Sequence, residues 1–294
     1  MRPGPVLALI AAVAALPAAA AELLGTHVWE PGFDGAGGWS ALWLEPEGEG
    51  FVVLSDRGTW ARGVLERDAG GAIAGVEVEA RGPLLRAGGA RPSWYESDAE
   101  SIAYADGAFW VGFEGARARS RVERYDDLAE PPSRTAPFGD VARFESNAGL
   151  EALASDAEGT LWAIPEEPPR GTDGFQVYRL AGGAWERAFT IPKVGRFLVT
   201  GADIGPDGRL YVLERAFALV GFRSRVRSFD LAGGDGRVEL ETRLRRHDNL
   251  EGIAVRRDAS GRLRLTMISD DNQRRLVQRT EWVEYLLEGE EAGG

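Results

Sequence analysis

The sequence predicts an all-β protein, a single β-propeller in which five blades surround a central channel. Three observations predict this fold. The chain is a series of short runs rich in β-branched and aromatic residues, with almost no helical periodicity. Asp-Gly, Glu-Gly and Gly-Gly turns separate the runs. One plan, an alternating strand, a turn and an aromatic-rich strand that ends on a charged residue, recurs five times.

Composition excludes several classes of protein. The chain has 294 residues, with Lys+Arg 34 against Asp+Glu 46, a net charge of −12 and no Cys. Without Cys there is neither a disulfide scaffold nor a thiolate metal site. An acidic surface argues against binding a nucleic-acid backbone. A hydrophobic content of 44% with 9% aromatics is enough to build a core.

The first residues have the layout of a secretory signal peptide. One early Arg precedes an apolar run from Val6 to Leu16, and Pro17 and small residues follow. The alternative, a membrane anchor, is disfavoured because this run is short for a span. We expect cleavage near Ala21 and a periplasmic or secreted protein. Residues 22–294 then form the propeller domain, with 33 basic and 46 acidic residues and a charge of −13.

The five units define the blades in chain order. Their first strands start at Ser40, Glu100, Glu151, Asp203 and Glu251, which gives spacings of 60, 51, 52 and 48 residues. A period near fifty residues with about four strands per unit is typical of a propeller. Six blades are the alternative if the long first unit hides an extra hairpin. A tandem of two small β domains would not explain a period that continues unbroken.

The outer strands and the closure of the ring can also be predicted. Segments Arg119–Asp126 and Arg223–Asp230 are nearly the same third strand in blades two and four. The fifth unit ends with one further strand, about Leu276–Leu286, and therefore lacks its outermost strand. The segment Glu22–Trp29 precedes blade one and can supply it. Closing the ring with strands from both chain ends removes an open seam.

Acidic residues recur at equivalent places of the repeat and are expected to meet on one face. The first strand of a blade lines the channel, and the antiparallel second strand ends where the first begins. We therefore expect an inner ring of Ser40, Glu100, Glu151, Asp203 and Glu251. A wider ring on the same face would contain Asp56, Glu114, Glu166, Glu214 and Asp270.

Nine carboxylates so close together repel one another and need a cation or arginine. A hard divalent ion such as calcium prefers oxygen ligands, and Arg57, Arg215, Arg274 and Arg275 follow the ring positions. The structural alternative is that each acid caps backbone N–H groups of the next blade. The mixture of Ser, Glu and Asp suggests that some blades supply ligands and others packing.

Other chemistry has weaker support. His247 precedes Asp248 and Asn249 at the entrance of blade five, so it is a candidate base or ligand, although a loop histidine without a role is the simpler interpretation. No G-x-S-x-G, P-loop or H-E-x-x-H motif is present. Tryptophans such as Trp39, Trp110 and Trp162 fall at strand positions expected to pack between blades.

Five motifs in order resemble a known family. They are Gly38-Trp-Ser-Ala-Leu-Trp-Leu with Leu54-Ser-Asp-Arg-Gly58, Asp98-Ala-Glu-Ser-Ile-Ala with Trp110-Val-Gly-Phe-Glu-Gly115, Asn147-Ala-Gly-Leu-Glu-Ala-Leu-Ala, Val212-Leu-Glu-Arg215, and Asn249-Leu-Glu-Gly-Ile-Ala with Ile268-Ser-Asp-Asp-Asn272. Together they resemble the esterase-like phytases, or phytase-like domain proteins. The resemblance implies an exported bacterial propeller and hydrolysis of phosphate esters or other esters. The departures are Ser40 in blade one and a single lysine, Lys193.

These observations lead to one function hypothesis and two alternatives. The hypothesis is a calcium-assisted ester hydrolase acting at the acidic mouth of the channel on a small anionic or ester substrate bridged by metal, with a monomer favoured. Candidate catalytic residues are Glu100, Glu251 and His247. Candidate substrate-binding residues are Arg57, Arg215 and Arg274. Candidate metal ligands are Glu100, Glu151, Asp203, Glu251, Asp56 and Asp270. The alternatives are a non-catalytic binding or assembly propeller and a metal-dependent lactonase or sugar-ester hydrolase.

Overall fold

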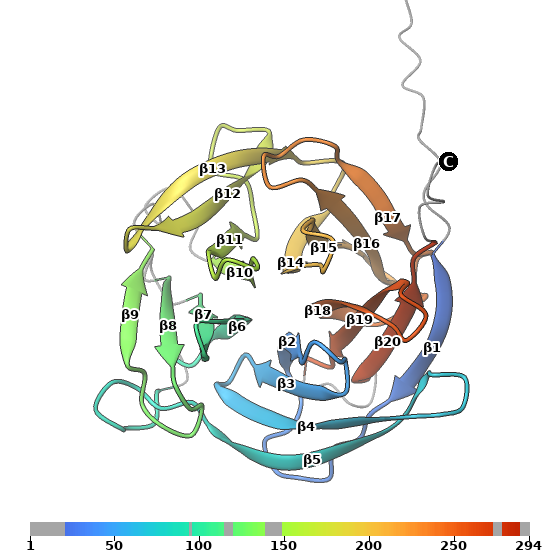
Figure 1. The fold of residues 1–294 in the computed structure, drawn as a ribbon, viewed down its shortest axis with the longest axis horizontal. Helices are drawn as coiled ribbons and strands as arrows, with labels where there is room; N and C mark the ends of the chain where they lie inside the picture. The colour runs from blue at the N-terminus through green and yellow to red at the C-terminus, as the bar shows by residue number, and fades with distance from the viewer. Residues whose placement is uncertain (1–20, 94–95, 115–119, 139–148, 273–277, 289–294) are drawn as a thin grey trace, which may run out of the picture.

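The computed structural model describes residues 21–93, 96–114, 120–138, 149–272 and 278–288. The described chain forms five four-stranded antiparallel sheets arranged around a central axis (Figure 1). This confirms the all-β propeller with five blades. The predicted signal peptide lies outside the described residues, except for Ala21. Within the described chain, no helix is long and apolar enough to cross a membrane.

Each blade is a sheet whose strands follow one another from the channel outward. Blade one consists of β2 (Trp39–Leu44), β3 (Gly50–Ser55), β4 (Thr59–Arg67) and β5 (Ile73–Pro83). Blade two consists of β6 (Ala99–Ala105), β7 (Ala108–Phe113), β8 (Arg121–Tyr125) and β9 (Arg134–Pro137). Blade three consists of β10 (Leu150–Ser155), β11 (Leu161–Pro165), β12 (Gly174–Ala181) and β13 (Ala184–Pro192). Blade four consists of β14 (Leu198–Ile204), β15 (Leu210–Ala218), β16 (Gly221–Phe229) and β17 (Arg237–Glu241). Blade five consists of β18 (Asn249–Arg257), β19 (Leu263–Asp270), β20 (Glu281–Leu286) and β1 (Glu22–Val28).

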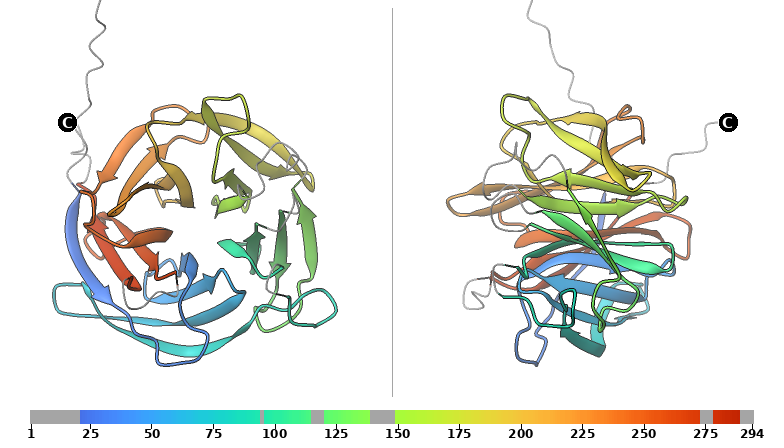
Figure 2. Two further views of the ribbon diagram at one scale, coloured as in Figure 1. Left: turned by 180° about the vertical axis from the view of Figure 1, so that it is seen from behind. Right: turned by 90° about the vertical axis from the view of Figure 1, so that its left-hand side faces the viewer.

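The ring closes in blade five, where strands from the two ends of the chain pair. Strand β1 lies antiparallel to β20, with Val28 opposite Glu281 and Glu22 opposite Leu286. The two strands lie side by side at the edge of the disc (Figure 2). The predicted closure by the N-terminal strand is therefore confirmed. The extra length of the first unit is in the long β4–β5 hairpin and the segment after it, so the first unit adds no sixth blade.

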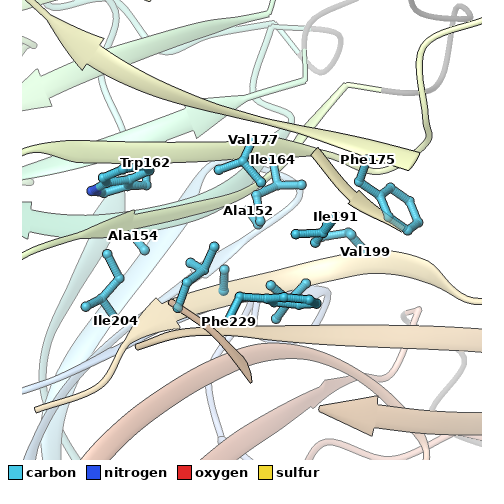
Figure 3. Packing of buried hydrophobic residues seen from close by; sticks show 13 residues of the cluster. Ala152, Ala154, Trp162, Ile164, Phe175, Val177, Ile191, Val199, Ile204 and Phe229 are labelled. Atoms are coloured by element: carbon cyan, nitrogen blue, oxygen red, sulfur yellow. The ribbon is translucent and has the colours of Figure 1, made fainter. Parts of the chain in front are cut away.

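Apolar side chains fill the space between neighbouring blades in five clusters, one for each pair of blades. The cluster between blades three and four joins Trp162 and Ile164 of β11 to Val199 of β14 and Phe229 of β16 (Figure 3). The inner strands are covered on both faces, so their sequences are nearly continuous hydrophobic runs. Trp39, Trp110 and Trp162 are buried, as predicted.

All five inner strands run in the same direction along the channel, because each is the first strand of an identical meander. We call the face where these strands begin the top face. The second strand of every blade ends at this face. The β15–β16 hairpin turn, the β17–β18 connection and the β19–β20 connection also lie there. The topology therefore confirms that the start of the first strand and the end of the second lie at one end of the channel.

Candidate metal centre

Each inner strand carries a β-bulge at the top of the channel, and the bulge turns one side chain out of the regular alternation. The register between first and second strands skips one residue at the same point of every blade. The five bulged residues are Ser40, Glu100, Glu151, Thr200 and Glu251. The predicted inner ring is thus correct in four blades and wrong in blade four, where Thr200 takes the place assigned to Asp203.

The two hydroxyl residues of this ring join adjacent blades. Ser40 Oγ donates to the carbonyl oxygen of Ala99 over 2.5 Å, and Thr200 Oγ1 donates to that of Leu250 over 3.1 Å. Ala99 and Leu250 each precede the bulged glutamate of the next blade. These two blades therefore supply packing, whereas Glu100, Glu151 and Glu251 line a small cavity on the channel axis.

Asp203 lies at the opposite end of the channel. Its Oδ2 accepts hydrogen bonds from the backbone of Val255 over 2.8 Å and from Arg256 Nη1 over 2.6 Å. Arg256 also donates to the carbonyl of Leu44, so this ion pair ties blades four, five and one together. The prediction that Asp203 ligates a metal on the top face is wrong.

A second set of side chains stands around the glutamates, at the ends of the second strands. Backbone N–H groups of Asp56, Glu114 and Glu166 donate to the carbonyls of Gly38, Asp98 and Gly149 over 2.9, 2.9 and 3.1 Å. The same register pairs Arg215 with Leu198 and Asp270 with Asn249. The equivalent residues are therefore Asp56, Glu114, Glu166, Arg215 and Asp270.

Glu214 does not belong to this set, contrary to the sequence prediction. It lies one residue earlier, and a shift of one residue moves a side chain to the other face of its strand. It is fully buried and accepts hydrogen bonds from Arg225 Nε over 2.7 Å and from Arg227 Nη2 over 2.5 Å. Its role is to neutralise these two buried arginines of β16.

Asp98 brings the acidic side chains of blade two together. One carboxylate oxygen each from Asp98, Glu100 and Glu114 lie within 4.8 Å of one another. Asp98 precedes the bulge by two residues, where the other blades carry Gly38, Gly149, Leu198 and Asn249. Asp98 is part of a repeated sequence motif but is not among the residues that the sequence predicts for the site. The alternation Asp98-x-Glu100, parallel to Asn249-x-Glu251, was the signal that could have found it.

Desolvation and mutual repulsion keep Glu100, Glu114 and Glu151 from ionising easily. Desolvation raises the pKa of Glu100 well above its usual range, and the charges of Glu151, Asp98 and Glu251 raise it further. Desolvation and Asp98 raise the pKa of Glu114 to about 7. Desolvation is also the main cause that raises the pKa of Glu151 well above its usual range, with further contributions from Glu166 and Glu114.

The surrounding acids show the same effect. Desolvation raises the pKa of Glu166 to about 7, even though Arg215 opposes the change. Desolvation and Glu251 raise the pKa of Asp270 to about 8. Desolvation raises the pKa of Asp56 to about 6 against the opposing charge of Arg57, which is exposed beside it. The basic residues at the mouth therefore do not offset the desolvation and repulsion of its acids.

Arg215 supplies its charge to the other side of the mouth. Its Nη1 donates to Glu251 Oε1 over 2.5 Å and to Asn249 Oδ1 over 2.6 Å, and its Nη2 lies 3.6 Å from Glu166 Oε1. Arg215 lowers the pKa of Glu251 against the stronger effect of desolvation, which leaves that pKa raised. The main causes of the raised pKa of Glu100 and of Glu114 include the charge of Asp98 and no arginine or lysine.

Two glycines make room for the acidic side chains. A Cβ atom at Gly149 would lie 2.0 Å from Glu114 Cγ, and one at Gly38 would lie 2.4 Å from Asp56 Oδ1. The Gly149 N–H donates to Glu114 Oε1 over 3.2 Å, and the Gly38 N–H donates to Asp271 Oδ1 over 3.0 Å. Carboxylates therefore pack directly against glycine backbone at the positions where blade two has Asp98.

Two further predicted site residues, His247 and Arg274, are not placed at the mouth by the described structure. His247 is buried, and its Nε2 lies 2.7 Å from the Tyr285 hydroxyl. Desolvation and the charge of Arg246 lower its pKa to about 4, and no ring carboxylate contributes to the shift. Arg274 lies outside the described residues. The structure thus brings Glu100, Glu151, Glu251, Asp56, Asp270 and Arg215 to the top face and places Asp203 away from it.

Solved structures with a similar fold include several glycoside hydrolases. They are a thermostable family-43 glycoside hydrolase (TM-score 0.51, 10% identity, 88% of this chain and 92% of that one), an exo-β-1,3-galactanase from Phanerochaete chrysosporium (TM-score 0.56, 9% identity, 90% and 65%) and a xylan β-1,4-xylosidase from Bacillus halodurans C-125 (TM-score 0.54, 11% identity, 88% and 54%). At this identity the likeness shows the fold alone. A search of curated proteins found no match.

The family model gives a more specific result, since it spans most of the propeller. The model for phytase-like proteins, described as "esterase-like activity of phytase", matches residues 34–273. This range includes all five inner strands and the acidic residues at their tops. The chain therefore belongs to the phytase-like family, as the motifs at the tops of its blades predict.

Proposed function

We propose that the protein is a divalent-cation-dependent hydrolase of phosphate esters or other esters and that it acts at the acidic top mouth of its channel. The observation that carries the proposal is the group of Asp98, Glu100 and Glu114. Membership of the phytase-like family supports an ester substrate. The calcium content of a periplasm or medium would suit such a site if the protein is exported, as its first residues indicate.

The donor set of blade two fits a hard cation such as calcium. Calcium binds six to eight oxygen ligands at about 2.3–2.6 Å, so oxygens that share one ion lie no more than about 5 Å apart. The oxygens of Asp98, Glu100 and Glu114 meet this condition at 4.8 Å. Neighbouring acids are among the main causes that raise the pKa of Glu100 and Glu114, so a cation bound to these three carboxylates would relieve that repulsion.

Two other acids of the mouth, Glu251 and Glu166, would then accept and donate protons during hydrolysis. A bound divalent cation polarises an ester or phosphoryl oxygen and lowers the pKa of a water molecule. Glu251 would accept a proton from the attacking water. Arg215 and Asn249 both bond to its Oε1, and no described residue donates to its Oε2, which leaves that oxygen for water. Glu166, with its pKa raised to about 7, would donate a proton to the leaving group.

Arg57 is the residue placed to bind substrate. It follows Asp56 at the rim, is exposed, and makes no described side-chain hydrogen bond. A guanidinium group pairs with two oxygens of a phosphate or carboxylate at once. Arg215, in contrast, is already bonded to Glu251 and Asn249, so we assign it to holding Glu251 rather than to holding substrate.

The test combines binding with turnover. Purified protein is titrated with calcium and with magnesium while its melting temperature is followed. Hydrolysis is then measured with phytate, aryl phosphates, carboxylic esters and lactones, with and without EDTA. The proposal predicts a calcium-dependent rise in melting temperature and EDTA-sensitive release of phosphate or acid. A protein that binds no divalent ion and hydrolyses none of these substrates would be a non-catalytic propeller.

The substrate panel also separates the two hydrolase classes that the mouth can serve. Phosphate release from phytate or aryl phosphates supports a phosphoesterase. Turnover of lactones and carboxylic esters alone supports a lactonase-like or sugar-ester hydrolase. Both use the same cation and base, so the difference is in the substrate's reacting group and in the contacts beyond the mouth.

A further inference from the structure

A groove of about 740 Å³ lies on the top face between blades four and five, next to the acidic mouth. This volume is in the range of small-molecule sites, about 300–1,000 Å³. One wall is the tip of the β15–β16 hairpin, and the other is formed by the β17–β18 connection and the residues before β20. The mouth and the groove share a border, because Arg215 Nη1 bonds to Glu251 and its guanidinium lies 5.9 Å from the Phe222 ring.

The hairpin wall is apolar and exposed. Phe217 is 63% exposed, Leu219 97% and Val220 61%, and the ring of Phe217 packs at 5.4 Å against that of Phe222. Hairpin tips usually carry glycine, asparagine or aspartate. Apolar side chains at the most exposed turn positions of an acidic protein lower its solubility unless a ligand covers them.

The opposite wall carries arginines. Arg245, Arg246 and Arg279 line it. No described residue makes a hydrogen bond or ion pair with the guanidinium of Arg245, whose backbone N–H donates to the carbonyl of Phe222 over 2.8 Å. A Cβ atom at Gly221 would lie 2.6 Å from Arg245 Cγ, so a glycine leaves the space that the stem of Arg245 occupies.

The two acids of the groove have internal hydrogen bonds. Asp248 accepts from the backbone of Arg279 over 2.8 Å and from Gln278 Nε2 over 3.2 Å. Glu281 accepts from the backbone of Asp248 over 3.2 Å, and its Oε2 lies 3.9 Å from His247 Nδ1. The described lining contains three arginines and two acids, so it is cationic. The neighbouring mouth is rich in carboxylates, and the whole chain has a net charge of −12.

We propose that this groove binds a small amphiphilic anion, a molecule with a flat apolar part and a sulfonate, phosphate or carboxylate group. The apolar part would lie against Phe217 and Val220, and the anionic group would contact Arg245 and Arg279. The groove's part in catalysis rests on the proposed function: it would hold the non-reacting part of an ester whose reacting group lies at the mouth. Aryl or long-chain anionic esters would then be preferred substrates.

The binding test uses probes that cannot be hydrolysed, in the presence of EDTA, so it does not depend on the cation site. Isothermal titration measures naphthalene-1-sulfonate, methanesulfonate and neutral 1-naphthalenemethanol against the full chain. We expect a single site that binds naphthalene-1-sulfonate at least about tenfold more tightly than either of the others. Equal affinity for the two sulfonates, or for the neutral alcohol and naphthalene-1-sulfonate, would overturn the assigned ligand class.

Two variants locate the site. Phe217→Ser and Arg245→Gln should each weaken naphthalene-1-sulfonate binding about tenfold. Both side chains are exposed, and unchanged melting curves check the fold. Val194→Ser, an apolar position 49% exposed outside the groove, is the matched control and should bind as the wild type does. Unchanged affinity in both groove variants would place the ligand elsewhere and contradict the inference.

The link to catalysis needs a separate measurement. With calcium present, kcat/KM is compared for 1-naphthyl and ethyl esters of the same acid in wild type and Phe217→Ser. A preference for the naphthyl ester that is lost in the variant supports the groove as part of the substrate site. Binding without such a preference would overturn that link but leave the ligand site intact. Absence of turnover on every ester would contradict the proposed function alone.

Discussion

Arg215 Nη1 donates a hydrogen bond to Glu251 Oε1 over 2.5 Å, and Arg215 occupies the position at which each of the other four blades carries an acidic residue. One arginine in a repeated acidic position divides the mouth into two halves. On one side, Arg215 bonds to Glu251 of blade five and lies 3.6 Å from Glu166 of blade three, so part of the acidic charge there is neutralised within the protein. The half at blade two, with Asp98, Glu100 and Glu114, is left for an external cation.

Removing Arg215 should therefore destabilise the protein. In Arg215→Met, Glu251 loses its charged partner, and Glu166 loses the charge that lowers its pKa. Leaving such a desolvated charge unpaired costs about 3–5 kcal/mol. We expect a loss of about this size in chemical unfolding without calcium. The double variant Arg215→Met with Glu251→Gln should recover part of it, and equal losses in the single and double variants would contradict the assigned pairing.

Stability without calcium should depend on pH with a definite sign. The carboxyl groups of Asp56, Glu114, Glu166 and Asp270 have pKa values of about 6, 7, 7 and 8 in the folded protein, above their values of about 4 in an unfolded chain. The folded state thus binds more protons than the unfolded state between about pH 4 and 8, and its stability falls as the pH rises through this window. Melting in EDTA at pH 5 and pH 8 measures it.

We expect a melting temperature lower at pH 8 than at pH 5 by several degrees, because four groups contribute. Saturating calcium should reduce the difference, since a bound cation favours the ionised carboxylates. A melting temperature that rises from pH 5 to pH 8 in EDTA would show that these acids are stabilised as anions by the protein itself.

Gly149 offers a test of the site by crowding. In Gly149→Ala the new Cβ would lie 2.0 Å from Glu114 Cγ, so the side chain of Glu114 must move. Calcium affinity should fall by about tenfold or more, because one of the three oxygens leaves its position. Gly32→Ala is the matched control, since nothing lies within 4 Å of a Cβ at Gly32. An unchanged calcium affinity in Gly149→Ala would remove Glu114 from the ligand set.

A variant of Asp203 tests whether cations bind only at the acidic end of the channel. Asp203→Asn loses the charge of the ion pair with Arg256 and should lower stability by about 1–3 kcal/mol. Its calcium-induced rise in melting temperature should equal that of the wild type, because Asp203 lies at the end opposite the acidic mouth. Loss of the calcium response in this variant would mean that cations bind at both ends.

The repeat made most of the fold readable from the sequence. Glu22–Trp29 was recognisable as the closing strand because the last unit lacked one, and β1 pairs with β20 accordingly. The sequence prediction for blade four is wrong because the bulged residue is Thr200, a hydroxyl residue, and the nearest acid of that strand is Asp203. Counting from the turn gives the position in blades one, three and four, whereas in blade five Glu251 precedes Asp258 by seven residues. Ser40, Glu151 and Thr200 each precede the first residue of their turn, Glu45, Asp156 and Gly205, by five residues.

The site was harder to predict because it depends on register at single-residue precision. Glu214 and Arg215 are neighbours in sequence, yet one is buried against Arg225 and Arg227 while the other faces the mouth. His247 was a candidate base from its position near Asn249, but the Tyr285 hydroxyl occupies its Nε2. His247 and Tyr285 are 38 positions apart in the sequence, so the repeat pattern of the blades does not predict their contact.

Calcium titration of the wild type and of Glu100→Gln, both first treated with EDTA, tests whether a cation binds at the acidic mouth. We expect calcium to raise the melting temperature of the wild type and to bind it in isothermal titration. Glu100→Gln should melt higher than the wild type without calcium, since it removes a desolvated and repelled carboxylate, and should lose the calcium response. Glu47→Gln, an exposed position, is the control and should respond as the wild type does. A wild type that binds no calcium, or a Glu100→Gln variant that binds it unchanged, would contradict a cation site at Asp98, Glu100 and Glu114.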